Sequence, residues 1–79
     1  MLDQYIGVYS SNQVPIKLTI TKSGHTLIVQ ATGQAANELE PSEKDTFKLE
    51  KAGIVLSFDP QEKTMVLKQG GGEFTFTKE

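Results

Sequence analysis

The sequence predicts an all-β domain, and three features carry that prediction. Several short runs alternate apolar with polar side chains, which is the period-two pattern of a half-buried strand. Val, Ile, Thr, Phe and Tyr, which suit a pleated surface, fill most of these runs. Turn residues separate the runs at short, regular intervals. The 79 residues leave room for a single domain over 1–79. Strands in this arrangement indicate a sandwich or a barrel built mainly from hairpins, and we expect a small up-and-down antiparallel β-barrel of about eight short strands.

The alternation locates the strands and the side chains that face inward. It is clearest in 15–22, where lysine and threonine occupy the face opposite the isoleucines and leucine. The expected strands are 4–9, 15–22, 26–31, 35–40, 46–50, 54–58, 64–69 and 73–78. Because one face of each strand must be buried, we expect an inward-facing set. This set comprises Ile16, Leu18, Ile20, Phe47, Leu49, Ile54, Leu56, Phe58, Phe74 and Phe76.

The segment 35–40 has two interpretations. Its residues have better helix than strand propensity. A helix would end at Pro41 after less than two turns, and so short a helix is not stable alone. A strand is the prediction, and a helical turn is the alternative.

Glycine-containing segments mark the connections. Ser23-Gly24 and Ala52-Gly53 separate runs of alternating residues, and Asp59-Pro60 has the residues that a type I turn favours. The three glycines at 70–72 could approach a phosphate closely. However, neither Lys-Ser nor Lys-Thr follows them and no helical pattern begins there, so a flexible hairpin connection is expected.

Composition and charge exclude several classes of function. The chain has no cysteine, which removes disulfides, thiolate metal sites and cysteine nucleophiles. Eight lysines stand against ten Asp plus Glu, and the net charge is −2. No stretch is basic, so nucleic acid is not an expected partner. No apolar run approaches the 18 residues or so of a membrane span, so none is expected.

Residues that could support catalysis are nearly absent. The single histidine, His25, lies beside Gly24 in an expected turn, where no neighbour would hold it against a nucleophile. Glu38, Glu40 and Glu43 form the densest acidic stretch, but the Asp-rich calcium-loop pattern does not accompany them. We therefore expect no enzyme activity, no metal and no cofactor.

The first expected strand contains the most informative pattern, Tyr5-Ile6-Gly7-Val8-Tyr9. Alternation places Tyr5, Gly7 and Tyr9 on one face, and a glycine between two tyrosines indicates a ring or backbone lying across it. This face is either an aromatic floor for a ligand or an anchor of the core. The candidate interior or ligand-facing residues are Tyr5, Gly7, Tyr9, Phe47, Phe58, Phe74 and Phe76.

Motifs spread along the chain resemble a known family. Leu2-x-x-Tyr5-x-Gly7-x-Tyr9 opens the sequence, and Leu39-x-Pro41 precedes Asp45-x-Phe47. Ile54-x-Leu56-x-Phe58-Asp59 leads into Met65-Val66-Leu67 and a last strand. This order is similar to the lipocalin-like C-terminal domain of β-lactamase-related (penicillin-binding-protein-like) serine hydrolases. The resemblance implies a β-barrel accessory module in a periplasmic or extracytoplasmic setting.

The same resemblance implies which partners to expect. The Ser-x-x-Lys motif of the hydrolase is missing, since none of the five serines has a lysine three residues on. The expected function is therefore a non-catalytic accessory or interaction domain. Its expected partner is a catalytic serine-hydrolase domain or a second copy of itself. The alternative is a small carrier that holds an apolar molecule in the barrel, since an eight-stranded barrel is just wide enough for its own side chains or one small ligand.

Overall fold

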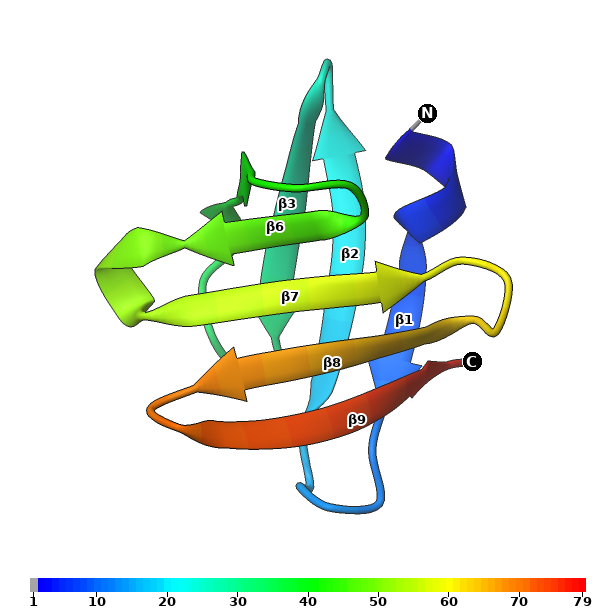
Figure 1. The fold of residues 1–79 in the computed structure, drawn as a ribbon, viewed down its shortest axis with the longest axis vertical. Coiled ribbons are helices and arrows are strands. Elements are labelled where there is room, and N and C mark those ends of the chain that lie inside the picture. Colours follow the sequence, from blue (N-terminus) through cyan, green and yellow to red (C-terminus); the bar gives the residue numbers. More distant parts are fainter. Residues whose placement is uncertain (1) are drawn as a thin grey trace.

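A computed structural model describes residues 2–79 as one antiparallel sheet that curls into a nearly closed barrel (Figure 1). The spatial order is β4-β3-β2-β1-β9-β8-β7-β6-β5, so nearly every strand pairs with its neighbour in sequence, and β1 also pairs with β9. In Figure 1, β6 and β7 cross in front of β2 and β3. The strands are β1 (Gly7–Ser10), β2 (Lys17–Ser23), β3 (Thr26–Ala31), β4 (Asn37–Glu38), β5 (Glu40–Pro41), β6 (Thr46–Leu49), β7 (Ile54–Asp59), β8 (Thr64–Gln69) and β9 (Gly72–Lys78). Two 3₁₀ helices accompany them, η1 (Leu2–Tyr5) and η2 (Glu50–Ala52). The predicted all-β barrel is confirmed.

The expected strand at 4–9 is wrong in its first half. Leu2–Tyr5 forms η1, and the strand begins only at Gly7. The Ile6 N–H donates to the Asp3 carbonyl at 3.3 Å, which closes the helical turn. Tyr5 is nevertheless buried, because the helix turns its ring into the end of the barrel. The other expected strands outside 35–40 lie within one or two residues of those observed.

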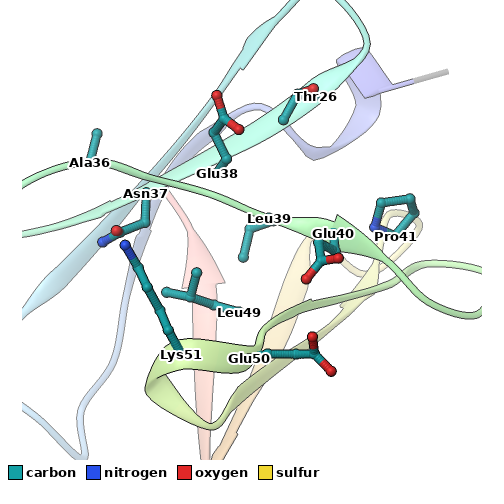
Figure 2. A pocket seen from close by; sticks show the side chains of 10 residues that line it. All are labelled: Thr26, Ala36, Asn37, Glu38, Leu39, Glu40, Pro41, Leu49, Glu50 and Lys51. Carbon is teal, nitrogen blue, oxygen red and sulfur yellow. The ribbon is translucent and has the colours of Figure 1, made fainter.

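The segment 35–40 is extended, and the helical alternative is wrong. The chain pairs first with β3 through β4, and then with β6 through β5. Leu39 stands between the two pairings and is only 2% exposed (Figure 2). Its N–H donates to the Leu27 carbonyl at 2.8 Å. This one segment therefore joins the two ends of the sheet, and Leu39 is a core residue absent from the predicted inward set.

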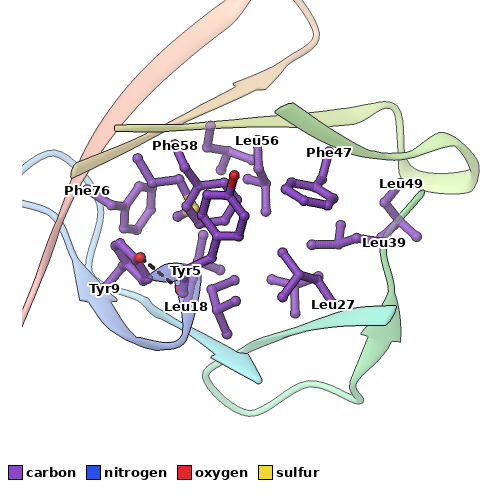
Figure 3. Close-up of a cluster of buried hydrophobic side chains, with 14 residues drawn as sticks. Tyr5, Tyr9, Leu18, Leu27, Leu39, Phe47, Leu49, Leu56, Phe58 and Phe76 are labelled. Atoms are coloured by element: carbon purple, nitrogen blue, oxygen red, sulfur yellow. Dashed lines mark hydrogen bonds between the residues drawn. The ribbon is translucent and has the colours of Figure 1, made fainter. Parts of the chain in front are cut away.

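Phe58 contacts three other aromatic rings within the buried cluster (Figure 3). Its ring centroid is 4.8 Å from that of Tyr5 and 5.8 Å from those of Tyr9 and Phe47. The contacts with Tyr9 and Phe47 are edge-on, an arrangement that aromatic pairs favour. The buried core comprises Tyr5, Tyr9, Leu18, Ile20, Leu27, Val29, Leu39, Phe47, Leu49, Leu56, Phe58, Met65, Leu67 and Phe76.

Three members of the predicted inward set are only partly buried. Ile16, Ile54 and Phe74 pack against the core but retain exposed surface. Ile16 lies just before β2, Ile54 begins β7, and Phe74 lies near the start of β9. The other members of that set are buried, as predicted.

The connection between β8 and β9 explains two of the consecutive glycines. Gln69 pairs with Gly72, so Gly70 and Gly71 alone make the turn. Both have positive φ, 57° and 85°. A two-residue hairpin whose central residues both have positive φ matches the twist of the flanking strands, and glycine enters that region without steric cost. The expected hairpin is confirmed.

Removal of the Phe58 ring is expected to destabilise the core severely. Phe58→Ala should lower the free energy of unfolding by about 3–5 kcal/mol, which is comparable to the whole stability of a small domain. Urea denaturation followed by tyrosine fluorescence measures the change. Phe74→Ala is the matched control and should cost clearly less, because Phe74 is only partly buried. Equal losses for the two variants would contradict this account of the core.

Candidate functional site

The predicted aromatic residues are distributed between the core and the rim of the barrel. Tyr5, Tyr9 and Phe47 each contact the Phe58 ring, and none of the four is more than 7% exposed. Phe76 is fully buried beside them, while Phe74 is partly exposed. The rings therefore occupy the barrel interior themselves and do not form a floor beneath an empty cavity.

One end of the barrel is closed by η1. The Tyr5 hydroxyl donates a hydrogen bond to the Asp45 carboxylate, and the Tyr9 hydroxyl donates to the Tyr5 carbonyl at 2.8 Å. Asp45 also accepts the Phe58 N–H at its carbonyl, at 2.7 Å, and has φ of 59°. A left-handed backbone is uncommon outside glycine, and aspartate is among the residues that tolerate it best. Asp45 thus fixes η1 to the turn before β6, a role that the sequence analysis missed.

The group that lies across Gly7 is the side chain of Lys78. A Cβ added at Gly7 would stand 2.5 Å from the Lys78 Cε, and φ of Gly7 is 153°. The expectation of a ring or backbone at this place was wrong. The Lys78 ammonium donates to the Gln4 carbonyl at 3.3 Å and stands 6.0 Å from the Tyr9 ring centroid. The absence of a side chain at Gly7 makes room for the aliphatic part of the Lys78 side chain, which packs beneath η1.

The opposite end of the barrel is open and forms a small apolar cup. Its volume is about 240 Å³, below the roughly 300 Å³ at which ligand sites usually begin. The Gln69 side-chain amide donates to the Ala52 carbonyl at 3.3 Å and borders the cup. The lining consists of Ile16, Leu18, Val29, Ala31, Gln34, Ala52, Ile54, Leu56, Leu67 and Gln69. The cup has room for one small apolar group.

A larger and more open groove of about 800 Å³ lies where β4 and β5 part from one another. Figure 2 shows the Lys51 side chain reaching toward Asn37 at one end of this groove. Carboxylates line much of its edge, and apolar side chains line its floor. The lining residues are Thr26, Ala36, Asn37, Glu38, Leu39, Glu40, Pro41, Leu49, Glu50 and Lys51. We call this feature the seam groove.

The outer face of β1 to β3 carries apolar side chains that do not join the core. Val8 pairs with Thr19 of β2, and Thr21 pairs with Ile28 of β3. Ile6 precedes the strand. Ile6, Val8 and Ile28 are each half-buried and lie outside the core cluster. We call Ile6, Val8, Thr19, Thr21 and Ile28 the outer apolar face.

Chemical groups for catalysis or metal binding are sparse. His25 is exposed in the β2–β3 turn. The hollow beside it, of about 400 Å³, is lined by Leu2, Tyr5, Lys22, Gly24, His25 and Phe47 and contains no serine. Within residues 2–79, no group of three or more His, Cys, Asp or Glu side chains is placed to hold a metal ion. Over the same range, no helix has the length and apolar character needed to cross a membrane.

Comparison of the chain with protein-family models, with curated proteins and with solved structures found no match. The structure defines a class of protein, a small antiparallel β-barrel whose centre is filled by aromatic rings. One end of the barrel is closed by η1, the other end forms the cup, and the seam groove opens the wall. The functional argument therefore starts from these surfaces.

Alkaline pH is expected to destabilise the barrel partly through its two tyrosines. Burial raises the pKa of both above the ordinary value of 10.0, and the Asp45 carboxylate raises the pKa of Tyr5 further. Since the folded state favours the protonated phenol, this contribution to stability is complete below about pH 10 and is lost as the pH rises through the raised pKa. Tyr5→Phe should cost about 1–3 kcal/mol at pH 7, where its hydrogen bond to a charged group is lost.

The same variant should show a shallower fall in stability above pH 10, because only Tyr9 then remains to titrate in the core. Urea denaturation from pH 7 to pH 11 on both proteins measures this difference. All other side chains are the same in the two proteins, so their contributions cancel in the comparison. Two pH profiles of equal slope would contradict the assigned role of Tyr5.

Proposed function

We propose that this chain is a non-catalytic interaction domain that acts beside a catalytic serine-hydrolase domain in an extracytoplasmic setting. The outer apolar face is the observation that carries the proposal. It spans three adjacent strands, and its five residues are apolar or threonine. An apolar surface left outside the core commonly marks an interface with another protein. The serine-hydrolase partner comes from the resemblance of the sequence motifs.

Within residues 2–79, the lack of an assembled nucleophile supports a role without catalysis. A serine nucleophile needs a base within hydrogen-bond reach, and the base in turn needs a partner that orients it. The chain's only histidine is exposed in a turn, and the hollow beside it contains no serine. The serine–lysine spacing of the hydrolase family is also missing from the sequence.

A carrier of one small apolar molecule is the second candidate, and the cup at the open end favours it. Its walls are mainly aliphatic, and its two glutamines supply polar groups at the edge. Against this, the cup is small, and aromatic rings fill the centre of the barrel. A fatty acid chain would have to displace the cluster around Phe58.

The interaction role is tested with the parent hydrolase, purified with and without this domain. Removal should change its molecular mass in solution or its turnover of long peptides relative to short ones, while the nucleophile stays intact. Val8→Lys should reproduce that loss, because it places a charge on the outer apolar face. Thr75→Lys adds the same charge at an exposed position of β9 and should have no effect. Unchanged mass and kinetics on removal of the domain would refute the proposal.

The carrier role is tested on the domain alone. We expect no saturable binding of a fatty acid or of a fluorescent apolar probe at micromolar concentrations, because the rings occupy the interior. Titration calorimetry and the shift in melting temperature report the result. One-to-one binding that is abolished by Leu56→Phe would favour the carrier role over the interaction role, since Leu56 lines the cup.

A further inference from the structure

The seam groove exists because one antiparallel pairing stops early. Glu40 of β5 pairs with Lys48 of β6. Continuation of the same register would bring Glu38 opposite Glu50, and like charges directly opposite each other destabilise a ladder. The chain instead turns toward β3 at Leu39, and Glu50 leaves the strand to begin η2. The wall of the barrel is therefore open between β4 and the end of β6.

The backbone of Glu38 faces this opening. The Leu39 N–H donates to the Leu27 carbonyl, so Leu39 and Leu27 stand at a hydrogen-bonding position of the antiparallel pairing. Hydrogen-bonded and non-hydrogen-bonded pairs alternate along antiparallel strands. The pair Glu38–Ile28 is consequently of the second type, and the N–H and carbonyl of Glu38 point away from β3. An exposed strand edge of this kind can pair with another extended chain.

The side chains around the opening add an apolar floor and an acidic rim. Leu39 and Leu49 lie on the floor and are at most 8% exposed. Glu38, Glu40 and Glu50 are exposed at the rim, where Lys51 is the one basic side chain of the lining. Glu50 forms a salt bridge with Lys48, with 3.2 Å between Glu50 Oε2 and Lys48 Nζ. Glu38 and Glu40 make no salt bridge within residues 2–79. The rim is therefore negative overall.

We propose that the seam groove binds an extended, basic peptide segment of a partner protein as an added strand. The backbone of that segment pairs with Glu38. Its side chains alternate, as in any strand. Lysine or arginine on one face lies beside Glu38 and Glu50, and small apolar residues on the other face contact Leu39 and Leu49. Opposite charges in neighbouring strands stabilise such a pairing.

The same charges argue against a second copy of this chain as the occupant. Two seam grooves placed edge to edge would bring the carboxylates of Glu38, Glu40 and Glu50 against their own counterparts. Charged side chains on a strand edge suppress that kind of self-association in natural sheets. The proposal goes beyond the interaction role suggested above, because the seam groove and the outer apolar face are different surfaces.

The test is a titration of the full chain, labelled with ¹⁵N, with a short acetylated and amidated peptide of alternating lysine and valine. We expect saturable shifts of the amide signals of Glu38, Leu39 and Glu50, and binding that weakens as salt is added. A peptide of alternating glutamate and valine should not bind. A lysine–valine peptide with a central proline should bind more weakly, because proline lacks the N–H that pairs with a strand edge.

Charge reversal at the rim provides matched variants. Glu38→Lys should weaken binding about fivefold to tenfold, in line with the loss and inversion of an exposed ion pair. Glu62→Lys makes the same change in net charge in the β7–β8 turn and should leave binding within about twofold. Thermal unfolding of both variants verifies that they are folded. Val8→Lys, which tests the outer apolar face, should not alter peptide binding.

Three results would overturn the proposal. One is the absence of shifts at peptide concentrations up to the millimolar range. Another is equal binding of the basic and acidic peptides, and the third is a set of shifts centred away from the seam groove. Failure of the serine-hydrolase proposal would leave this test unaffected, because the two experiments use different partners and different surfaces.

Discussion

Aromatic packing around Phe58 is the interaction on which the barrel depends. Strands of two to seven residues enclose a thin interior, and each aromatic ring buries on the order of 150–250 Å². Rings from η1, β1 and β6 converge on Phe58 of β7, so a single cluster ties the N-terminal strands to the C-terminal ones. The plug at one end follows from it, since Tyr5 belongs to this cluster and also bonds Asp45. The same cluster fills the centre of the barrel. Partners would therefore bind at the outer surfaces and at the rim of the seam groove.

The strands were predictable where one face is buried and the other is solvated. β2 and β6 have that arrangement, and the period-two pattern locates both within two residues. The first strand was misjudged because Tyr5 and Tyr9 alternate with Ile6 and Val8 in the sequence, although Tyr5 ends the helical turn η1 and only Tyr9 lies in β1. The hydrogen bond that positions Tyr5 joins residues 40 apart in the sequence. No local pattern reports such a contact.

The candidate sites were less predictable than the fold. The sequence places a ring on the inner face of a strand, but it does not say whether other rings fill the space in front of it. Lys78 could have been anticipated, because it continues the alternation of Phe74 and Phe76. The seam groove could not, since it depends on the registers of β3 and β6 together with the point at which Leu39 passes from one to the other. These registers are set by tertiary packing.

The pairing of β1 with β9 has a consequence for how the chain reaches its native state. Tyr9 pairs with Lys78, and the Glu79 N–H donates to the Val8 carbonyl at 2.8 Å. Contacts between residues so distant in sequence raise the contact order. The chain loses conformational entropy when it closes so long a loop, and the favourable contacts form only after that loss. Hairpins such as β2–β3 and β8–β9 form from local contacts. We therefore expect the barrel to close late in folding, with the edge of β1 open to pairing with other chains until β9 docks against it.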